Sequence, residues 1–257
     1  MTIENLLKNS GLPGPRGNLE LLYSFSKNAT KNEVDECFSF YRDDLHNSPE
    51  EFVVMCGIVG YCILNKDNIQ KTLTTIRKYA SHSSWRIRES VAIGIQKIAE
   101  NNISGILNNL KEWLDGNDLE KRAIVAALCE PKLLKEKSII IQVLEILNII
   151  TMSFDKIDGK LSEDQKSLQK TLGYGWSVAI ASLPNEGKVA FEKITKCNNK
   201  HIKWIVKENL KKNRLTVMDK KWVEKMHATL VYKRIHASFL LVASAFATFF
   251  LVLYWCL

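Results

Sequence analysis

The sequence is poor in the two residues that most often interrupt helices. It has 5 prolines and 12 glycines in 257 residues, so long helices are permitted. No segment shows the period-two alternation of apolar and polar residues that indicates a strand. Because 46% of the residues are hydrophobic and 25% are charged, the chain can bury a sizeable core. These features predict an all-α globular protein.

The motifs of common catalytic and metal sites are also missing. The five histidines are scattered, and the sequence has no HExxH, GxSxG or P-loop pattern. The stretch around Asp158-Gly159 resembles the middle of a calcium loop. However, it places Phe154, Lys156 and Gln165 where acidic ligands belong. We therefore expect neither a metal nor a cofactor.

Cysteine usage argues against a disulfide framework. The six cysteines form no CxxC pair and lie mostly among apolar residues: Cys37, Cys56, Cys62, Cys129, Cys197 and Cys256. This pattern is typical of reduced, buried thiols in a cytosolic protein, and a disulfide set or a zinc site is the alternative. The N-terminus has no basic start followed by a long apolar run, so we predict no signal peptide.

The net charge of +8 is concentrated near the C-terminus. Residues 198–234 hold eleven basic and three acidic residues, whereas residues 1–197 hold 25 of each sign. Five of the basic residues are predicted to face lipid: Lys220, Lys221, Lys225, Lys233 and Arg234. The net positive charge is therefore a property of residues 198–234 and not of the whole chain.

Short breaks divide most of the chain into helical segments. We predict an N-terminal lead-in over residues 1–18, a helical domain over 19–215, a basic segment over 216–234 and an apolar tail over 235–257. Within the domain, Ser48 and Pro49 are typical of the N-cap and first position of a helix. The predicted helices are residues 19–27, 32–45, 50–64, 68–79, 85–100, 103–114, 119–129, 134–153, 163–183, 184–197 and 200–213.

Two of these helices begin alike. Trp85 and Leu119 are 34 positions apart, and so are Arg88 and Arg122. Residues 200–207 are a third, weaker copy. Helix pairs of this size, repeated along a chain, are the signature of an α-solenoid. We therefore predict a right-handed, HEAT-like superhelix of helix pairs.

The C-terminal tail is long enough to cross a membrane. Residues 239–257 contain no charge, and 19 helical residues span about 28 Å, close to the hydrocarbon core of a bilayer. Lys233 and Arg234 flank one end and Tyr254-Trp255 the other, as expected at interfaces. This predicts a single transmembrane helix over 235–257 that anchors a cytoplasmic domain. The alternative is a buried helix that caps the repeats.

One group of residues points to a specific chemistry. Trp85 and Glu89 are four apart on one predicted helix, Arg122 lies in the equivalent helix of the next repeat, and Gly175-Trp176 lies in a later one. Here residues 19–215 resemble the HEAT-like AlkD-type alkylpurine DNA glycosylases. That family carries an Asp at the Glu89 position and a second Arg at the position of Ala179.

The resemblance implies roles for these residues. Trp85 and Trp176 would stack on the lesion nucleotide, Glu89 would stabilise the developing sugar cation as the catalytic group, and Arg122 would contact the phosphate. A carboxylate suits an oxocarbenium-like transition state, and aromatic faces attract a cationic base. The alternative is structural, with the tryptophans in the core and the Arg and Glu in contacts between repeats.

Two functions therefore remain open. The first is a membrane-anchored scaffold that recognises a partner protein or nucleic acid on its concave face. The second is an AlkD-type glycosylase that excises alkylated purines from duplex DNA, or a non-catalytic DNA-binding relative. The tail favours the scaffold, and the Trp/Glu/Arg/Trp set favours the glycosylase.

Overall fold

The computed structural model describes residues 1–230, and every regular element in that range is a helix. The all-α prediction is therefore confirmed. The α-helices are α1 (Ile3–Lys8), α2 (Leu19–Asn28), α3 (Lys31–Ser39), α4 (Pro49–Leu64), α5 (Ile69–Ile76), α6 (Trp85–Leu110), α7 (Asp118–Leu128), α8 (Lys137–Met152), α9 (Glu163–Ser182), α10 (Pro184–Ile194) and α11 (Lys200–Leu210). Residues 213–230 form a further helix. The predicted tail over 235–257, Lys233 and Arg234 lie outside the described residues.

Local capping explains most of the helix boundaries. The Ser48 hydroxyl accepts a hydrogen bond from the backbone N–H of Glu51, and Pro49 occupies the first turn of α4. This start was predicted from the sequence and is confirmed. Helix α6 continues through the predicted break, but Asn102 has non-helical dihedrals of −152° and 73°. Its side chain accepts from the N–H of Gly105, so the chain restarts a helix there.

One predicted helix is shorter than expected. The sequence predicted a helix over 32–45, whereas α3 ends at Ser39. The Phe40 N–H turns back to Cys37 O, and the Tyr41 N–H bonds to Phe38 O. The chain then passes through a turn that ends in Leu45, which is buried. Burial of Leu45 therefore comes from tertiary packing rather than from a continuous apolar stripe on the helix.

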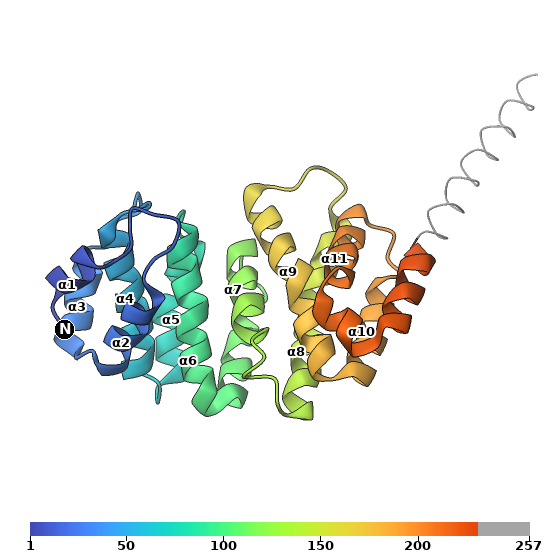
Figure 1. Ribbon diagram of the computed structural model, residues 1–257, viewed down its shortest axis with the longest axis horizontal. Coiled ribbons are helices and arrows are strands. Elements are labelled where there is room, and N and C mark those ends of the chain that lie inside the picture. Colours follow the sequence, from blue (N-terminus) through green and yellow to red (C-terminus); the bar gives the residue numbers. More distant parts are fainter. Residues whose placement is uncertain (231–257) are drawn as a thin grey trace, which may run out of the picture.

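The helices stand side by side in an elongated row, with the N-terminal helices at one end and residues 213–230 at the other (Figure 1). Along this row α4 contacts α6, α6 contacts α7, α7 contacts α9, and α9 contacts α11. Two glycines permit close approach. A Cβ on Gly94 would lie 2.6 Å from the Cys62 sulfur, and one on Gly175 would lie 2.8 Å from Val125. Any larger side chain would separate those helices.

The N-terminal lead-in is tied to the body by a buried polar network. Arg86 Nη2 donates to Gly14 O at 2.7 Å, and Arg86 Nη1 lies 3.5 Å from the Glu51 carboxylate. Glu51 also accepts from the Ser84 hydroxyl and from the backbone N–H of Asn47. Both charged side chains are buried, and such charges are tolerated only when paired and hydrogen-bonded.

The core supports the reading of the cysteines as thiols. In the described part, Cys37, Cys56, Cys62 and Cys129 are free and buried, and Cys197 is free and half-buried. Burial raises the pKa of Cys62 and of Cys129 to about 12. These buried thiols behave as small apolar core residues. Cys256 lies outside the described residues.

Candidate functional site

Three of the four predicted site residues come together on α6 and α7. Arg122 Nη2 of α7 donates to Glu89 Oε2 of α6 at 2.8 Å. Trp85 lies one turn earlier on α6, and its side chain is 47% exposed. The Arg86 guanidinium lies 4.8 Å from the centre of the Trp85 ring. The exposed indole therefore rests on a buried cation beside the Glu89–Arg122 ion pair.

A further arginine, Arg88, belongs to the same cluster and was not predicted as a site residue. Its Nη1 donates to the backbone oxygens of His82 and Ser83, both at 2.6 Å. Burial lowers the pKa of Arg88, and the positive charge of Arg122 lowers it further. Within residues 1–230, Arg88 Nε and Arg122 Nη1 are buried without a hydrogen-bond partner. This corner therefore holds more donors than the surrounding protein satisfies.

Trp176 does not join this cluster. Its side chain is fully buried, and its indole N–H donates to Thr151 Oγ1 at 2.9 Å. The ring also makes an edge contact with Phe191, with centroids 5.6 Å apart. This corrects the expectation that Trp176 stacks on a ligand. Gly175 allows α9 to approach α7 closely, and this packing explains the Gly-Trp motif.

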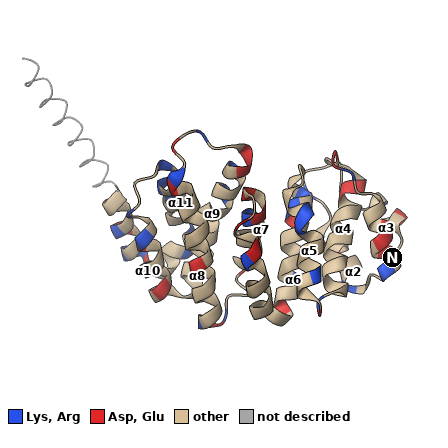
Figure 2. Cartoon of the chain, turned by 180° about the vertical axis from the view of Figure 1, so that it is seen from behind, with Lys and Arg blue, Asp and Glu red and all other residues tan. Residues whose placement is uncertain are grey.

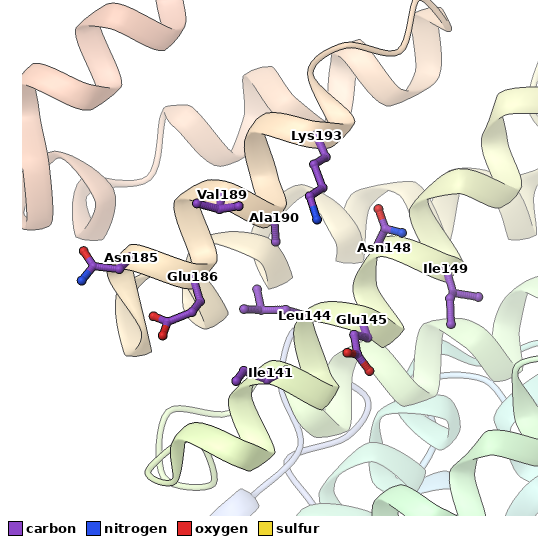
Figure 3. A pocket seen from close by; sticks show the side chains of 10 residues that line it. All are labelled: Ile141, Leu144, Glu145, Asn148, Ile149, Asn185, Glu186, Val189, Ala190 and Lys193. Atoms are coloured by element: carbon purple, nitrogen blue, oxygen red, sulfur yellow. The ribbon is translucent and has the colours of Figure 1, made fainter.

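A further candidate is a groove between α8 and α10 with a volume of about 760 Å³. In Figure 3, Ala190 and Lys193 point from α10 toward α8, and Leu144 lies opposite them. Two apolar side chains at the groove are unusually exposed, Val189 at 58% and Ile149 at 54%. The Lys137–Glu186 ion pair joins the two helices at one end. Ile141, Glu145, Asn148 and Asn185 complete the lining.

No known protein family, curated protein or solved structure matches the chain. The resemblance to AlkD-type glycosylases therefore rests on the short motifs alone, and a function has to be argued from geometry. Within residues 1–230, no group of three His, Cys, Asp or Glu side chains is placed to hold a metal ion.

Three of the four predicted lipid-facing lysines lie on the helix over residues 213–230. Lys220, Lys221 and Lys225 are exposed there, and Lys220 lies 3.9 Å from Glu224. Figure 2 shows further Lys and Arg at this end of the molecule. The opposite side of this helix is anchored to α10, because Lys188 pairs with Asp219 and the Trp222 indole donates to Glu192 at 2.8 Å. Residues 216–230 of the basic segment thus pack against the folded body.

The sequence did not predict the groove, because the apolar composition of α8 is typical of a helix buried in the core. Among residues 1–230, the stretch Lys137–Lys156 is the one helical segment long and apolar enough to span a membrane, and half of it is buried. The signal that could have found the groove is the excess of apolar residues on α8. A helix covered on one side needs an apolar stripe on that side only.

Proposed function

We propose that this chain is a membrane-tethered binding scaffold whose groove between α8 and α10 receives an apolar helical segment of a partner protein. The helix pairs would form a HEAT-like solenoid, and residues 235–257 would anchor it with the body in the cytoplasm. The groove carries the proposal, because it combines a volume of about 760 Å³ with exposed Val189 and Ile149. Exposed apolar side chains in a concave surface with a polar rim mark candidate binding sites.

Neighbour contacts support the solenoid part of the proposal. The matched positions Trp85 and Leu119 lie in the first turns of α6 and α7, which pack against each other. Helices α4, α6, α7, α9 and α11 follow one another through such contacts. A stack of helix pairs with contacts mainly between neighbours is the organisation of helical-repeat scaffolds. The charge-free tail and the basic helix before it support tethering at an anionic cytoplasmic leaflet.

The binding test uses the full chain held in lipid nanodiscs. A photoreactive residue at position 189 identifies partner segments in cell membranes, and each segment is then made as a pure peptide and titrated. We expect helical apolar peptides to bind. Val189→Glu should weaken binding by about tenfold or more, which corresponds to about 1.4 kcal/mol, because a charge would have to be desolvated.

The matched control is Val217→Glu. Val217 is 78% exposed and lies on the helix over 213–230, away from the groove lining. The change in charge and volume is the same, so general effects on solubility cancel. Equal binding by the two variants would contradict the proposal.

A second candidate function, binding of duplex DNA, is favoured by the unsatisfied guanidinium nitrogens of Arg88 and Arg122 beside exposed Trp85. Both donors are buried, so phosphate oxygens would reach them only if the neighbouring side chains moved, whereas the exposed indole offers a stacking surface directly. Excision of an alkylated base has less support, because Glu89 is already paired with Arg122 and Trp176 is buried.

The assay is release of alkylated purines from methylated duplex DNA at low salt, with protein in excess. Catalysis requires that the wild-type chain releases base and that Glu89→Gln abolishes the release while leaving the fold intact. DNA binding without release, lost in Arg122→Gln, would indicate the non-catalytic relative. If the chain neither binds DNA nor releases base, only the scaffold function remains.

A further inference from the structure

Two charged residues without a partner lie on opposite walls of the groove between α8 and α10. Glu145 is on α8 and Lys193 is on α10, and both are exposed. Within residues 1–230, no hydrogen bond or ion pair joins either side chain to another residue. The third charged residue of the lining, Glu186, is paired with Lys137. The groove therefore presents one unneutralised charge of each sign.

Apolar residues beside these charges are also uncovered. Val189 on α10 is 58% exposed and Ile149 on α8 is 54% exposed, and Met152 follows one turn later on α8 at 36%. A purely apolar ligand does not suit this mixture, because it would desolvate Glu145 and Lys193 without compensation. A protein surface that offers a charge of opposite sign to each of them does. The occupant should therefore carry both an acid and a base.

The two walls of the groove run in the same direction. Lys137 opens α8, Glu186 lies in the first turn of α10, and their ion pair joins these two starts. In Figure 3, Asn148 and Lys193 lie toward the other end of the groove. A two-fold axis along the groove keeps both helix directions and sets α8 of one copy against α10 of another. Under that symmetry the two walls are complementary to each other.

We propose that a second copy of this chain covers the groove, related to the first by a two-fold axis along it. Glu145 of each copy then meets Lys193 of the other, so the interface holds the same ion pair twice and leaves neither charge unpaired. Val189 of each copy packs against the exposed side of α8 around Ile149. This inference rests on the proposed function of the groove as a protein-binding site, and it names an identical chain as the partner.

The size of the face indicates a weak dimer. Helix α8 has 16 residues and α10 has 11, and such helices are about 24 and 17 Å long. With helix axes about 10 Å apart, the two cover about 400 Å², about half of the roughly 800 Å² that each partner buries in a standard interface. Dimers should therefore form when attachment to one membrane concentrates the copies, as the proposed function provides.

The test is a charge swap in the full chain, held in liposomes of neutral lipid. Donor and acceptor dyes at position 217, which is exposed and outside the groove lining, report association by energy transfer. Glu145→Lys or Lys193→Glu in all copies sets like charges against each other and should weaken association by about tenfold or more. Mixing the two variants should restore energy transfer, because every base again meets an acid. The double variant should restore it as well.

The matched controls are Glu36→Lys on α3 and Lys71→Glu on α5. Both residues are exposed, and they make the same changes of charge away from the groove. Energy transfer should stay at the wild-type level in both. Thermal unfolding should be the same for all variants, since Glu145 and Lys193 have no partner to lose within one copy.

Three results would overturn the inference. They are no energy transfer in the wild type at any ratio of protein to lipid, single variants that associate as the wild type does, and a mixture that does not recover. Failure of the proposed function is read separately, from the photoreactive residue at position 189. Peptides of other proteins that bind the groove, with no effect of the charge swap, would remove only the second copy. Capture of no helical segment at all would remove the proposed function as well.

Discussion

The indole N–H of Trp176 donates to the hydroxyl of Thr151 at 2.9 Å, and both side chains are fully buried between α8 and α9. Trp176→Ala should lower the free energy of unfolding by about 3–5 kcal/mol, because it leaves a large cavity and an unpaired hydroxyl. Chemical denaturation followed by circular dichroism measures this. Trp85→Ala is the matched control and should cost far less, since Trp85 is 47% exposed. Equal losses would contradict the assignment of Trp176 to the core.

The buried Glu51–Arg86 pair gives a second stability prediction. Glu51→Leu leaves the Arg86 guanidinium buried without its carboxylate, and should cost about 3–5 kcal/mol of unfolding free energy. Adding Arg86→Met should recover much of that loss, because no charge then remains buried. Asp35→Leu, which breaks the exposed pair with Lys31, should change stability by about 0.5 kcal/mol or less. A double variant as unstable as Glu51→Leu would refute this account.

The basic helix over 213–230 predicts salt-sensitive binding to anionic lipid. A chain truncated after Leu230 should bind anionic vesicles weakly, and added salt should abolish that binding. Lys221→Gln with Lys225→Gln should weaken it by about 2 kcal/mol, because each lysine near the surface contributes about 1 kcal/mol. Vesicle co-sedimentation measures this.

The control for lipid binding is Lys132→Gln with Lys135→Gln. These two lysines are also exposed but lie between α7 and α8, so the net charge changes equally at a distant place. Equal losses from both pairs, or equal binding to neutral vesicles, would rule out a local electrostatic contact.

Cys197 gives a prediction about pH. Burial raises the pKa of its thiol, and the hydrogen bond that it donates to Asp155 at 2.8 Å raises it further. Asp155→Asn should therefore lower the thiol pKa and speed alkylation, which needs the thiolate. The acceleration should be visible below both pKa values and vanish at a pH above them.

Mass spectrometry of the Cys197 peptide follows this reaction without interference from other cysteines. Asp158→Asn is the control, because Asp158 lies three residues after Asp155 but its carboxylate does not raise the pKa of the thiol. An equal rate in wild type and Asp155→Asn would show that the hydrogen bond does not govern the thiol.

Helix positions could be predicted from the sequence because capping is local. Ser48 with Pro49 and the break near Asn102 depend on residues within one turn, which the sequence shows directly. The early end of α3 could not be predicted, since Leu45 is buried by distant helices although it lies beyond the helix. Apolar periodicity alone does not separate these two causes of burial.

The exposure of the tryptophans could not be predicted either. A serine adjoins both Trp85 and Trp176 in the sequence, yet one is half exposed and the other has no exposed surface. The difference depends on neighbours far along the chain. Thr151 and Phe191 surround Trp176, whereas Trp85 sits in the first turn of α6 over Arg86. The groove was missed for the same reason, because the cover of α8 is set by which helices reach it.

The neighbour contacts along α4, α6, α7, α9 and α11 also decide how the protein comes apart. A helix at either end loses contacts with few others when it opens, so the cost of opening is local rather than shared by the whole chain. Loss of structure should spread inward from the ends, with α6 and α7 opening last. Such a row of helices unfolds by fraying at its ends rather than in one cooperative transition. The helix over residues 213–230 is at one of the two ends where fraying begins.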